Sequence, residues 1–248
     1  MNPNKIKRPS FWTSWMIFWS GIGFLAVYPL LALLLSRKKW FFYAQIVRRA
    51  WVNWCLFWGF IRIEQIFEEP LMKYKPYVIT PNHTSKLDML TLVGRLGVDI
   101  SYMAREEIQH IPLFGIFIRT IDIPIDLNNS RKTVIAYQRG LDHLKNGNNL
   151  VIFPEGTISS MTPKLSAFKD GAFKMAIEQQ VDVVPVTIIG NWKLASDFGP
   201  FNFKPGRVIQ YVHKPISTLG MTSRQTGELK QKVFRIIEQK LAAYGYYQ

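Results

Sequence analysis

An apolar run leads directly into a polar cluster in the stretch Tyr77-Val78-Ile79-Thr80-Pro81-Asn82-His83-Thr84-Ser85-Lys86-Leu87-Asp88. The first four residues are β-branched or aromatic and predict a strand. A second stretch repeats this arrangement: Leu150-Val151-Ile152 predicts a strand, and Phe153-Pro154-Glu155-Gly156-Thr157 follows it. Ligand sites of α/β sheets lie at the carboxyl ends of strands, so we predict one site built from both clusters. Because the first cluster pairs a histidine with an aspartate, the sequence favours an enzyme over a binding module.

Short β-branched runs alternate with helical patterns beyond residue 70, which predicts an α/β layered domain. The expected strands are 77–80, 100–104, 121–125, 150–153, 183–189 and 208–212, and the expected helices are 88–94, 105–117, 130–145, 171–179 and 223–244. Pro112 and Gly115 should interrupt the second helix, and Asn146-Gly147 should end the third. We divide the chain into an N-terminal membrane-associated helical motif, residues 1–68, and an α/β catalytic domain, residues 69–248.

The charge balance points to an anionic partner. The 248 residues carry a net charge of +14, which suits lipid headgroups, phosphate substrates or nucleic acid. Residues 1–75 hold a net +8 together with seven of the eight tryptophans. Basic residues mixed with tryptophan beside a long apolar run are typical of a membrane interface rather than a nucleic-acid groove. The single cysteine, Cys55, excludes an internal disulfide.

A membrane segment is predicted near the N-terminus. Residues 9–36 are 28 positions without a charge, and a span needs about 20 apolar residues. We predict a second, interfacial helix over residues 40–61, because Arg48 and Arg49 at its middle are costly in hydrocarbon. Basic residues on both sides of the first segment favour a helical hairpin in one leaflet; a true span and a buried helix pair are the alternatives. These flanks are Lys5, Lys7 and Arg8 before the segment and Arg37, Lys38 and Lys39 after it.

The spacing of His83 and Asp88 restricts how they can meet. Five residues of ideal helix turn through about 500°, so the two side chains cannot share a helix face. They can pair only if His83 lies in the strand-to-helix loop and Asp88 in the first helical turn. Asp88 can then accept the ring N–H of His83 and leave the other nitrogen free as a base. A helix-capping loop with an incidental histidine is the structural alternative.

Two further residues have two readings each. Glu155 can accept hydrogen bonds from a substrate polyol or cap backbone amides in a turn. Lys169 precedes a predicted helix N-terminus, where it can bind a phosphate or face water. His83, Asp88 and Glu155 together can supply three metal ligands, but the four histidines and one cysteine do not favour a zinc site. No nucleophile motif G-x-S-x-G occurs, which favours direct transfer to a bound hydroxyl.

These motifs together resemble the 1-acylglycerol-3-phosphate acyltransferase family, one of the glycerolipid acyltransferases. Its first block, Asn-His-x4-Asp, matches Asn82, His83 and Asp88, and its third block matches residues 153–157. Residues 168–173 and Val184-Pro185-Val186 match two more blocks, so the resemblance covers about residues 70–215. It implies a mixed, largely parallel central sheet flanked by helices, preceded by a two-helix membrane-anchoring motif. It also implies catalysis by His83 and Asp88 without metal or cofactor. The substrate-binding residues that it implies are Asn82, Arg105, Glu155, Gly156, Thr157 and Lys169.

Two positions depart from the family pattern. The second block usually ends in an arginine implicated in holding the acceptor phosphate, but Leu127 stands there. Ile158 occupies a position after the third block where arginine is common. Two expected cations are therefore absent from the sequence. Other cations are available to compensate: Arg105, where the family often has lysine, and Arg119, Arg131, Lys164 and Lys169.

The resemblance implies an acyl transfer from acyl-CoA or acyl carrier protein to the sn-2 hydroxyl of 1-acylglycerol-3-phosphate, giving phosphatidic acid. The expected partners are this lysolipid, the acyl donor and a phospholipid membrane, not nucleic acid. The expected location is a bacterial cytoplasmic membrane, with the catalytic domain facing the cytosol. Two alternatives remain: another lysolipid acceptor such as a lyso-aminolipid, and a basic membrane-binding module without chemistry. The sequence does not specify an oligomeric state.

Overall fold

A computed structural model describes residues 10–111, 115–159, 161–196 and 202–246. The helices are α1 (Phe11–Leu35), α2 (Phe41–Trp58), α3 (Leu87–Leu92), α4 (Gly115–Thr120), α5 (Ser130–Lys145), α6 (Gly171–Gln179), α7 (Asn191–Leu194) and α8 (Thr226–Ala243), with 3-10 turns η1 (Lys38–Trp40), η2 (Glu106–His110) and η3 (Ser223–Gln225). The strands are β1 (Ile61–Phe67), β2 (Tyr77–Pro81), β3 (Ile100–Arg105), β4 (Ile123–Ile125), β5 (Asn149–Val151), β6 (Asp182–Ile189), β7 (Ala195–Ser196), β8 (Asn202–Phe203) and β9 (Gly206–Val212).

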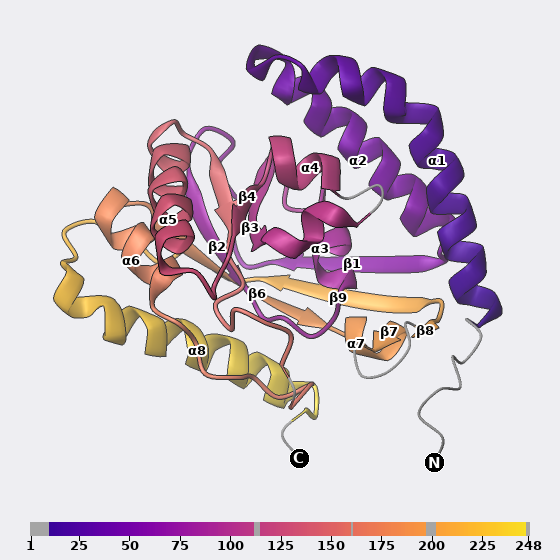
Figure 1. Ribbon diagram of the computed structural model, residues 1–248. Helices are drawn as coiled ribbons and strands as arrows, with labels where there is room; N and C mark the ends of the chain where they lie inside the picture. Colours follow the sequence, from indigo (N-terminus) through magenta and orange to yellow (C-terminus); the bar gives the residue numbers. More distant parts are fainter. Residues whose placement is uncertain (1–9, 112–114, 160, 197–201, 247–248) are drawn as a thin grey trace.

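A seven-stranded sheet forms the centre of the molecule, in the order β1-β9-β6-β2-β5-β3-β4 (Figure 1). Every neighbouring pair in it is parallel except β6 with β9. The predicted mixed, largely parallel α/β sheet is therefore confirmed. The parallel strands β2, β5, β3 and β4 all end at the same edge, so the loops that follow them meet there.

Each face of the sheet has its own apolar core. Along β2, Tyr77 and Ile79 belong to one core and Val78 to the other, as the alternation of side chains along a strand requires. One core contains residues of α1, α2, α3 and α4, and we call this side the hairpin face. The other contains residues of α5, α6 and α8, and we call it the α5–α6 face. Figure 1 shows these two groups of helices on opposite sides of the sheet.

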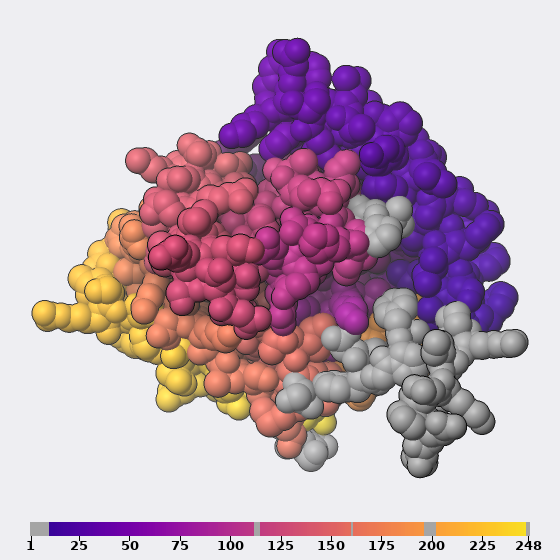
Figure 2. Space-filling model, in the orientation of Figure 1, coloured from indigo at the N-terminus to yellow at the C-terminus, as the bar shows by residue number. Residues whose placement is uncertain are grey.

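The helices α1 and α2 form an antiparallel hairpin held by tryptophans. The indole N–H of Trp15 donates to the carbonyl of Trp58, and the indoles of Trp51 and Trp54 donate to carbonyls of α1. Gly23 allows the close approach, because a Cβ there would lie 2.3 Å from the Trp54 ring. Within the described residues, α1 is the single helix long and apolar enough to cross a membrane. Of its most apolar 18-residue stretch, 17% is buried. The hairpin is thus a rigid unit that leaves most of α1 on the molecular surface (Figure 2).

The two arginines of α2 do not have the surroundings expected of an interfacial helix. Arg48 is buried and makes two 3.2 Å hydrogen bonds to the Asp122 carboxylate, and its guanidinium also lies over the rings of Tyr102 and Phe117. Arg49 pairs with Asp99 at 2.9 Å on the surface. Both charges therefore attach α2 to the sheet domain instead of facing headgroups. Pairing with carboxylates offsets the free-energy cost of placing these two charges away from water, the cost on which the prediction of an interfacial helix was based.

Several predicted elements agree with the structure and others differ. Helices α5 and α6 have the expected bounds, and Gly147 after α5 has a left-handed φ of 81°. The predicted helix 105–117 is divided into η2 and α4 around Pro112, which lies outside the described residues. The second helix ends at Trp58, and residues 61–67 form the unpredicted strand β1. Since β1 pairs with β9 throughout its length, part of segment 1–68 belongs to the sheet; the domain division itself stays a prediction. The flanking Lys5, Lys7 and Arg8 lie outside the described residues.

We predict that Arg48→Met lowers the free energy of unfolding by about 3–5 kcal/mol, because it leaves a buried carboxylate without its partner. The side chains of Arg48 and Asp122 are 6% and 0% exposed. Arg49→Met is the matched control: its pair is about one third exposed and should be worth about 1 kcal/mol or less. Denaturant unfolding of both variants in detergent micelles measures the difference. Equal losses would contradict a special role for the buried pair.

Candidate active site

The loop between β2 and α3 presents His83 at the edge of the sheet. Its Nδ1 lies 2.9 Å from Oδ2 of Asp88, which stands in the first turn of α3. The imidazole stacks on the Phe153 ring, with the centroids 4.0 Å apart and the planes 21° apart. A carboxylate can only accept from Nδ1, so the proton lies on Nδ1 and the lone pair on Nε2. The predicted pairing of loop histidine and helix aspartate is present.

Asp88 is fully buried and has hydrogen bonds to both oxygens. Oδ2 accepts from the backbone N–H groups of Thr84 at 2.6 Å and Ser85 at 2.8 Å, in addition to the imidazole. Oδ1 accepts from the side-chain amide of Asn191 at 2.7 Å. Hydrogen bonds of this kind stabilise the ionised form of a buried carboxylate and fix its orientation. Asp88 therefore holds both the loop and the imidazole.

Asn82 and Glu155 attach the His83 loop to its neighbours. The side chain of Asn82 donates to the carbonyl of Ile188 and accepts from its N–H, at 3.0 and 2.7 Å. Glu155 accepts from the backbone N–H of His83 through Oε1 and of Ser166 through Oε2, both at 2.8 Å. Burial raises the pKa of Glu155 to about 7, against the lowering effect of those two hydrogen bonds. The side chains of Asn82 and Glu155 thus both form hydrogen bonds with backbone groups.

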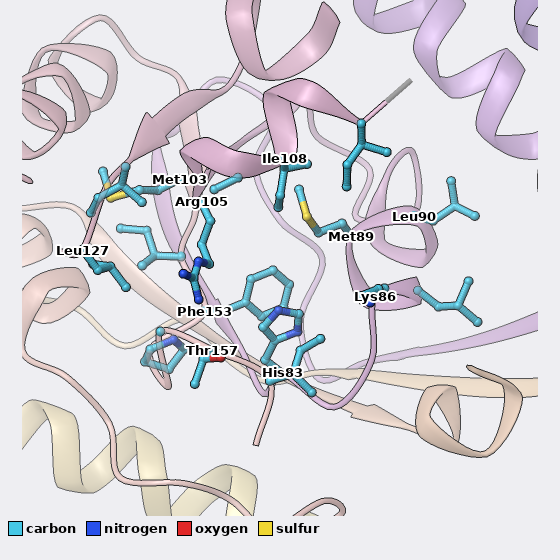
Figure 3. Close-up of a pocket in the computed structure, with 18 of the residues that line it drawn as sticks. His83, Lys86, Met89, Leu90, Met103, Arg105, Ile108, Leu127, Phe153 and Thr157 are labelled. Atoms are coloured by element: carbon cyan, nitrogen blue, oxygen red, sulfur yellow. The ribbon is translucent and has the colours of Figure 1, made fainter. Parts of the chain in front are cut away.

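A cavity of about 940 Å³ opens in front of the imidazole (Figure 3). The predicted residues in its wall are His83, Arg105, Gly156, Thr157 and Lys169. Asn82, Asp88 and Glu155 are not in this wall. Asn82 and Glu155 hydrogen-bond to backbone groups instead, which for Glu155 is the amide-capping alternative. Contact of either side chain with substrate stays a prediction.

The cations in the wall have different surroundings. Arg105 is exposed and forms an ion pair with Glu107 at 3.1 Å, which raises the pKa of Arg105. The Lys169 side chain passes over Gly156, where a Cβ would lie 2.9 Å from its ammonium nitrogen. Gly156 has a left-handed φ of 74°, which glycine adopts without strain. Its missing side chain also leaves the space that the Lys169 side chain occupies. Leu127 and Ile158, the two departures from the family pattern, also line this cavity.

Asn191 and Phe153 are site residues whose roles the sequence analysis missed. Asn191 is fully buried at the start of α7, directly after β6, and it also donates to Thr91 at 2.9 Å. A signal existed: Asn191 follows the strand 183–189 as Asn82 follows 77–80, so it is a third polar residue at a strand end. Nothing in the local sequence indicates that Phe153 would stack on the histidine.

Metal ligation finds little support in this geometry. No group of three or more His, Cys, Asp or Glu side chains in the described part of the chain is arranged to hold a metal ion. The oxygens of Asp88 and Glu155 that sequence reasoning offered as ligands accept hydrogen bonds from amides instead. Independence from metals and cofactors stays a prediction.

A solved structure has the same fold. The molecule is an α/β domain with a histidine–aspartate pair at the carboxyl edge of its sheet. Its fold is that of the crystal structure of the 1-acyl-sn-glycerophosphate (LPA) acyltransferase PlsC from Thermotoga maritima. The TM-score is 0.80 at 24% identity, over 94% of this chain and 95% of that one.

The sequence comparisons give the family. The acyltransferase family model matches residues 62–189. The chain is 32% identical over 189 residues to the 1-acyl-sn-glycerol-3-phosphate acyltransferase of Saccharomyces cerevisiae, which covers 74% of this chain and 61% of that protein. It is 29% identical over 182 residues to a probable enzyme of the same name from Mycoplasma pneumoniae, covering 68% of each. The chain thus spans about 61% of the yeast relative's length. It belongs to the acyltransferase family, which confirms the resemblance found in its motifs.

The raised pKa of Glu155 predicts a pH dependence of stability. Between its ordinary value of 4.5 and the folded value of about 7, the folded state keeps a proton that the unfolded state has released. The free energy of unfolding therefore falls as pH rises through this window and levels off above it. Relative to Glu155→Gln, the wild-type protein should lose on the order of 3 kcal/mol between pH 4.5 and pH 8. Denaturant unfolding of both proteins across this range tests it; a constant difference would show that Glu155 titrates normally.

Proposed function

We propose that the protein transfers a fatty acyl group from a thioester, acyl-CoA or acyl carrier protein, to the sn-2 hydroxyl of 1-acylglycerol-3-phosphate. The main support is the His83 imidazole, bonded to buried Asp88 at 2.9 Å and placed in the wall of a large cavity. The names of the relatives point to the same acceptor. The product would be phosphatidic acid, a precursor of membrane phospholipids.

The proposed reaction needs one proton acceptor and no covalent intermediate. His83 Nε2 takes the proton of the acceptor hydroxyl as its oxygen attacks the thioester carbonyl carbon. The carbon–oxygen bond forms, the carbon–sulfur bond breaks, and the thiol leaves with the proton carried by the imidazolium. Asp88 stabilises that imidazolium through Nδ1, and its other hydrogen bonds keep it in place. General-base assistance of this kind contributes about 10²–10⁴ in rate.

The surface of the hairpin supports a membrane location. Large apolar side chains of α1 are exposed, among them Phe11, Phe18 and Leu25 at 68%, 59% and 71%. Helix α2 is attached to the sheet domain by Arg48, so a hairpin lying in one leaflet holds the catalytic cavity at the membrane surface. We place the protein on a bacterial cytoplasmic membrane with the sheet domain in the cytosol, where soluble thioesters are found.

The residues of the cavity wall bear on whether the headgroup of the acceptor carries a phosphate. Leu127 and Ile158 make the cavity wall apolar where the family has arginines, which favours a headgroup less charged than usual, such as a lyso-aminolipid. Lys169 and Arg105 remain available for a phosphate. Among the described residues, no carboxylate lies within ion-pair distance of the Lys169 ammonium. Lys169 is therefore the better phosphate ligand of the two, and we keep the phosphate-bearing acceptor as the leading proposal.

His83→Ala should fold normally and lose about 10²–10⁴ of kcat, because the hydroxyl then has no base. The loss of kcat is measured in detergent micelles from the rate at which thioester cleavage releases the free thiol. His110→Ala is the matched control, since His110 is exposed and outside the cavity wall. Equal activity of the two variants would refute His83 as the base. Absence of thioester cleavage by the wild-type protein would leave a membrane-binding module without chemistry as the function.

Lys169→Ala should raise KM for 1-acylglycerol-3-phosphate about tenfold, the value of one charge-assisted hydrogen bond. KM for a lysolipid of equal chain length without a phosphate should not change. Lys174→Ala is the control, because Lys174 is an exposed lysine five residues further along the chain, on α6, and lies outside the cavity wall. If the wild-type protein prefers the acceptor without a phosphate, the lyso-aminolipid alternative replaces the leading one.

A further inference from the structure

Helix α5 lines the cavity on one side and exposes a second side to solvent. Thr133 and Tyr137 are part of the cavity wall. The exposed side, which we call the outer face of α5, consists of Arg131, Val134, Ile135 and Arg139. Positions 131, 135 and 139 are four residues apart, so their side chains form one row along the helix. The outer face is therefore adjacent to the cavity without being part of its wall.

The two apolar side chains of the outer face are not explained by the stability of the helix. Val134 and Ile135 are 67% and 60% exposed. β-branched residues are weaker helix formers than the residues usual at exposed helix positions. A single exposed apolar residue is common on protein surfaces, but here two adjacent ones lie between two arginines. Apolar side chains surrounded by arginine are typical of a protein–protein interface.

The two arginines of the outer face carry uncompensated charge. Within the described part of the chain neither Arg131 nor Arg139 forms an ion pair, whereas Lys132 pairs with Glu106 at 2.8 Å. Over its whole length α5 contains four Lys or Arg residues and one acidic residue, Asp142, near its end. The outer face is therefore positively charged, which favours association with an acidic partner.

The shape and position of the outer face select the kind of partner. The side of a helix is convex, whereas binding sites for small molecules are concave, so this face suits a macromolecule rather than free acyl-CoA. The helices α1 and α2, whose exposed apolar surface supports the membrane location, pack on the opposite side of the sheet from α5 (Figure 1). A bilayer that receives α1 therefore leaves the outer face of α5 open to the aqueous phase, where a soluble protein can bind it.

We propose that the outer face of α5 is the docking surface for the carrier-protein form of the thioester donor, an acidic protein that holds the acyl group on a flexible arm. Acidic side chains of the carrier pair with the two arginines, and the contact covers the two apolar side chains between them. From there the arm has only to pass Thr133 and Tyr137 to enter the cavity. This proposal rests on the proposed acyl transfer and assigns a place on the molecule to one of its two donors.

The first test compares two donors, palmitoyl acyl carrier protein and palmitoyl-CoA, which present the same pantetheine arm and thioester. In phosphatidylcholine nanodiscs, Arg131→Glu combined with Arg139→Glu should raise KM for the carrier-protein donor about tenfold or more, because like charges then meet at the interface. KM for palmitoyl-CoA should not change, which also shows that the variant is folded. Added salt should raise the wild-type KM for the carrier-protein donor, since exposed charges are screened.

The matched control reverses two exposed charges on α8, which packs on the same side of the sheet but does not line the cavity. Lys232→Glu combined with Arg235→Glu gives the same change of net charge and should leave both KM values as in wild type. An equal rise of KM for the carrier-protein donor in both double variants would be an effect of overall charge and would overturn the proposal. An equal rise for both donors in the α5 variant, or a wild-type protein that uses palmitoyl-CoA alone, would overturn it as well.

The second test measures binding without turnover. The probe is a fluorescent acyl carrier protein whose acyl group is held by an amide in place of the thioester. Its affinity for the protein in nanodiscs should fall in the charge-reversal variant of α5, and about fivefold in Val134→Ser combined with Ile135→Ser, which keeps the charge. If these variants instead lose affinity for phosphatidylglycerol vesicles and bind the carrier as wild type does, the outer face contacts a membrane and the proposal is wrong. Carrier binding that depends on α5, without transfer to any lysolipid, would overturn the proposed acyl transfer and leave the docking surface in place.

Discussion

The buried carboxylate of Asp88 is the interaction on which the site depends. A charge fully removed from water is costly unless hydrogen bonds replace its hydration. Here two loop amides, the Asn191 side chain and the His83 imidazole supply them. The same bonds that make burial of the charge tolerable also fix the loop around it. Asp88 therefore determines the backbone conformation of the loop and the direction of the imidazole at once.

The loop itself is held from β6 and β5, the two strands that flank β2 in the sheet. Asn82 attaches its beginning to β6 through Ile188, and Glu155, in the loop after β5, accepts from the His83 amide. Asn191 approaches Asp88 from the end of β6. Because these groups come from neighbouring strands of a rigid sheet, the imidazole has little freedom to move. The polar residues of the motifs mostly support the histidine, and only a few of them line the cavity where a substrate can contact them.

Local patterns in the sequence predicted the elements whose formation is local. Helices α5 and α6 have apolar spacing of their own and were placed correctly, and α5 is also capped by the Asn129 side chain. Strand β1 was missed because its partner β9 begins at Gly206, so nothing near residue 61 indicates the pairing. Arg48 was misjudged for the same reason, since its partner Asp122 is 74 residues away. The histidine–aspartate pair was predictable from spacing alone, whereas the roles of Asn82 and Glu155 depend on backbone amides brought close by tertiary structure.

The attachment of the hairpin gives the membrane segment a second consequence. A flexible anchor would bring the protein to a bilayer, but it could not form a wall of the cavity. Indole-to-carbonyl bonds make α1 and α2 one rigid unit, and the Arg48–Asp122 pair fixes that unit to the sheet. The relation between the bilayer-facing surface of α1 and the imidazole is therefore set by the fold. Residues of both hairpin helices line the same cavity as His83, so the fold places the unit that carries the exposed apolar surface in one wall with the proposed base.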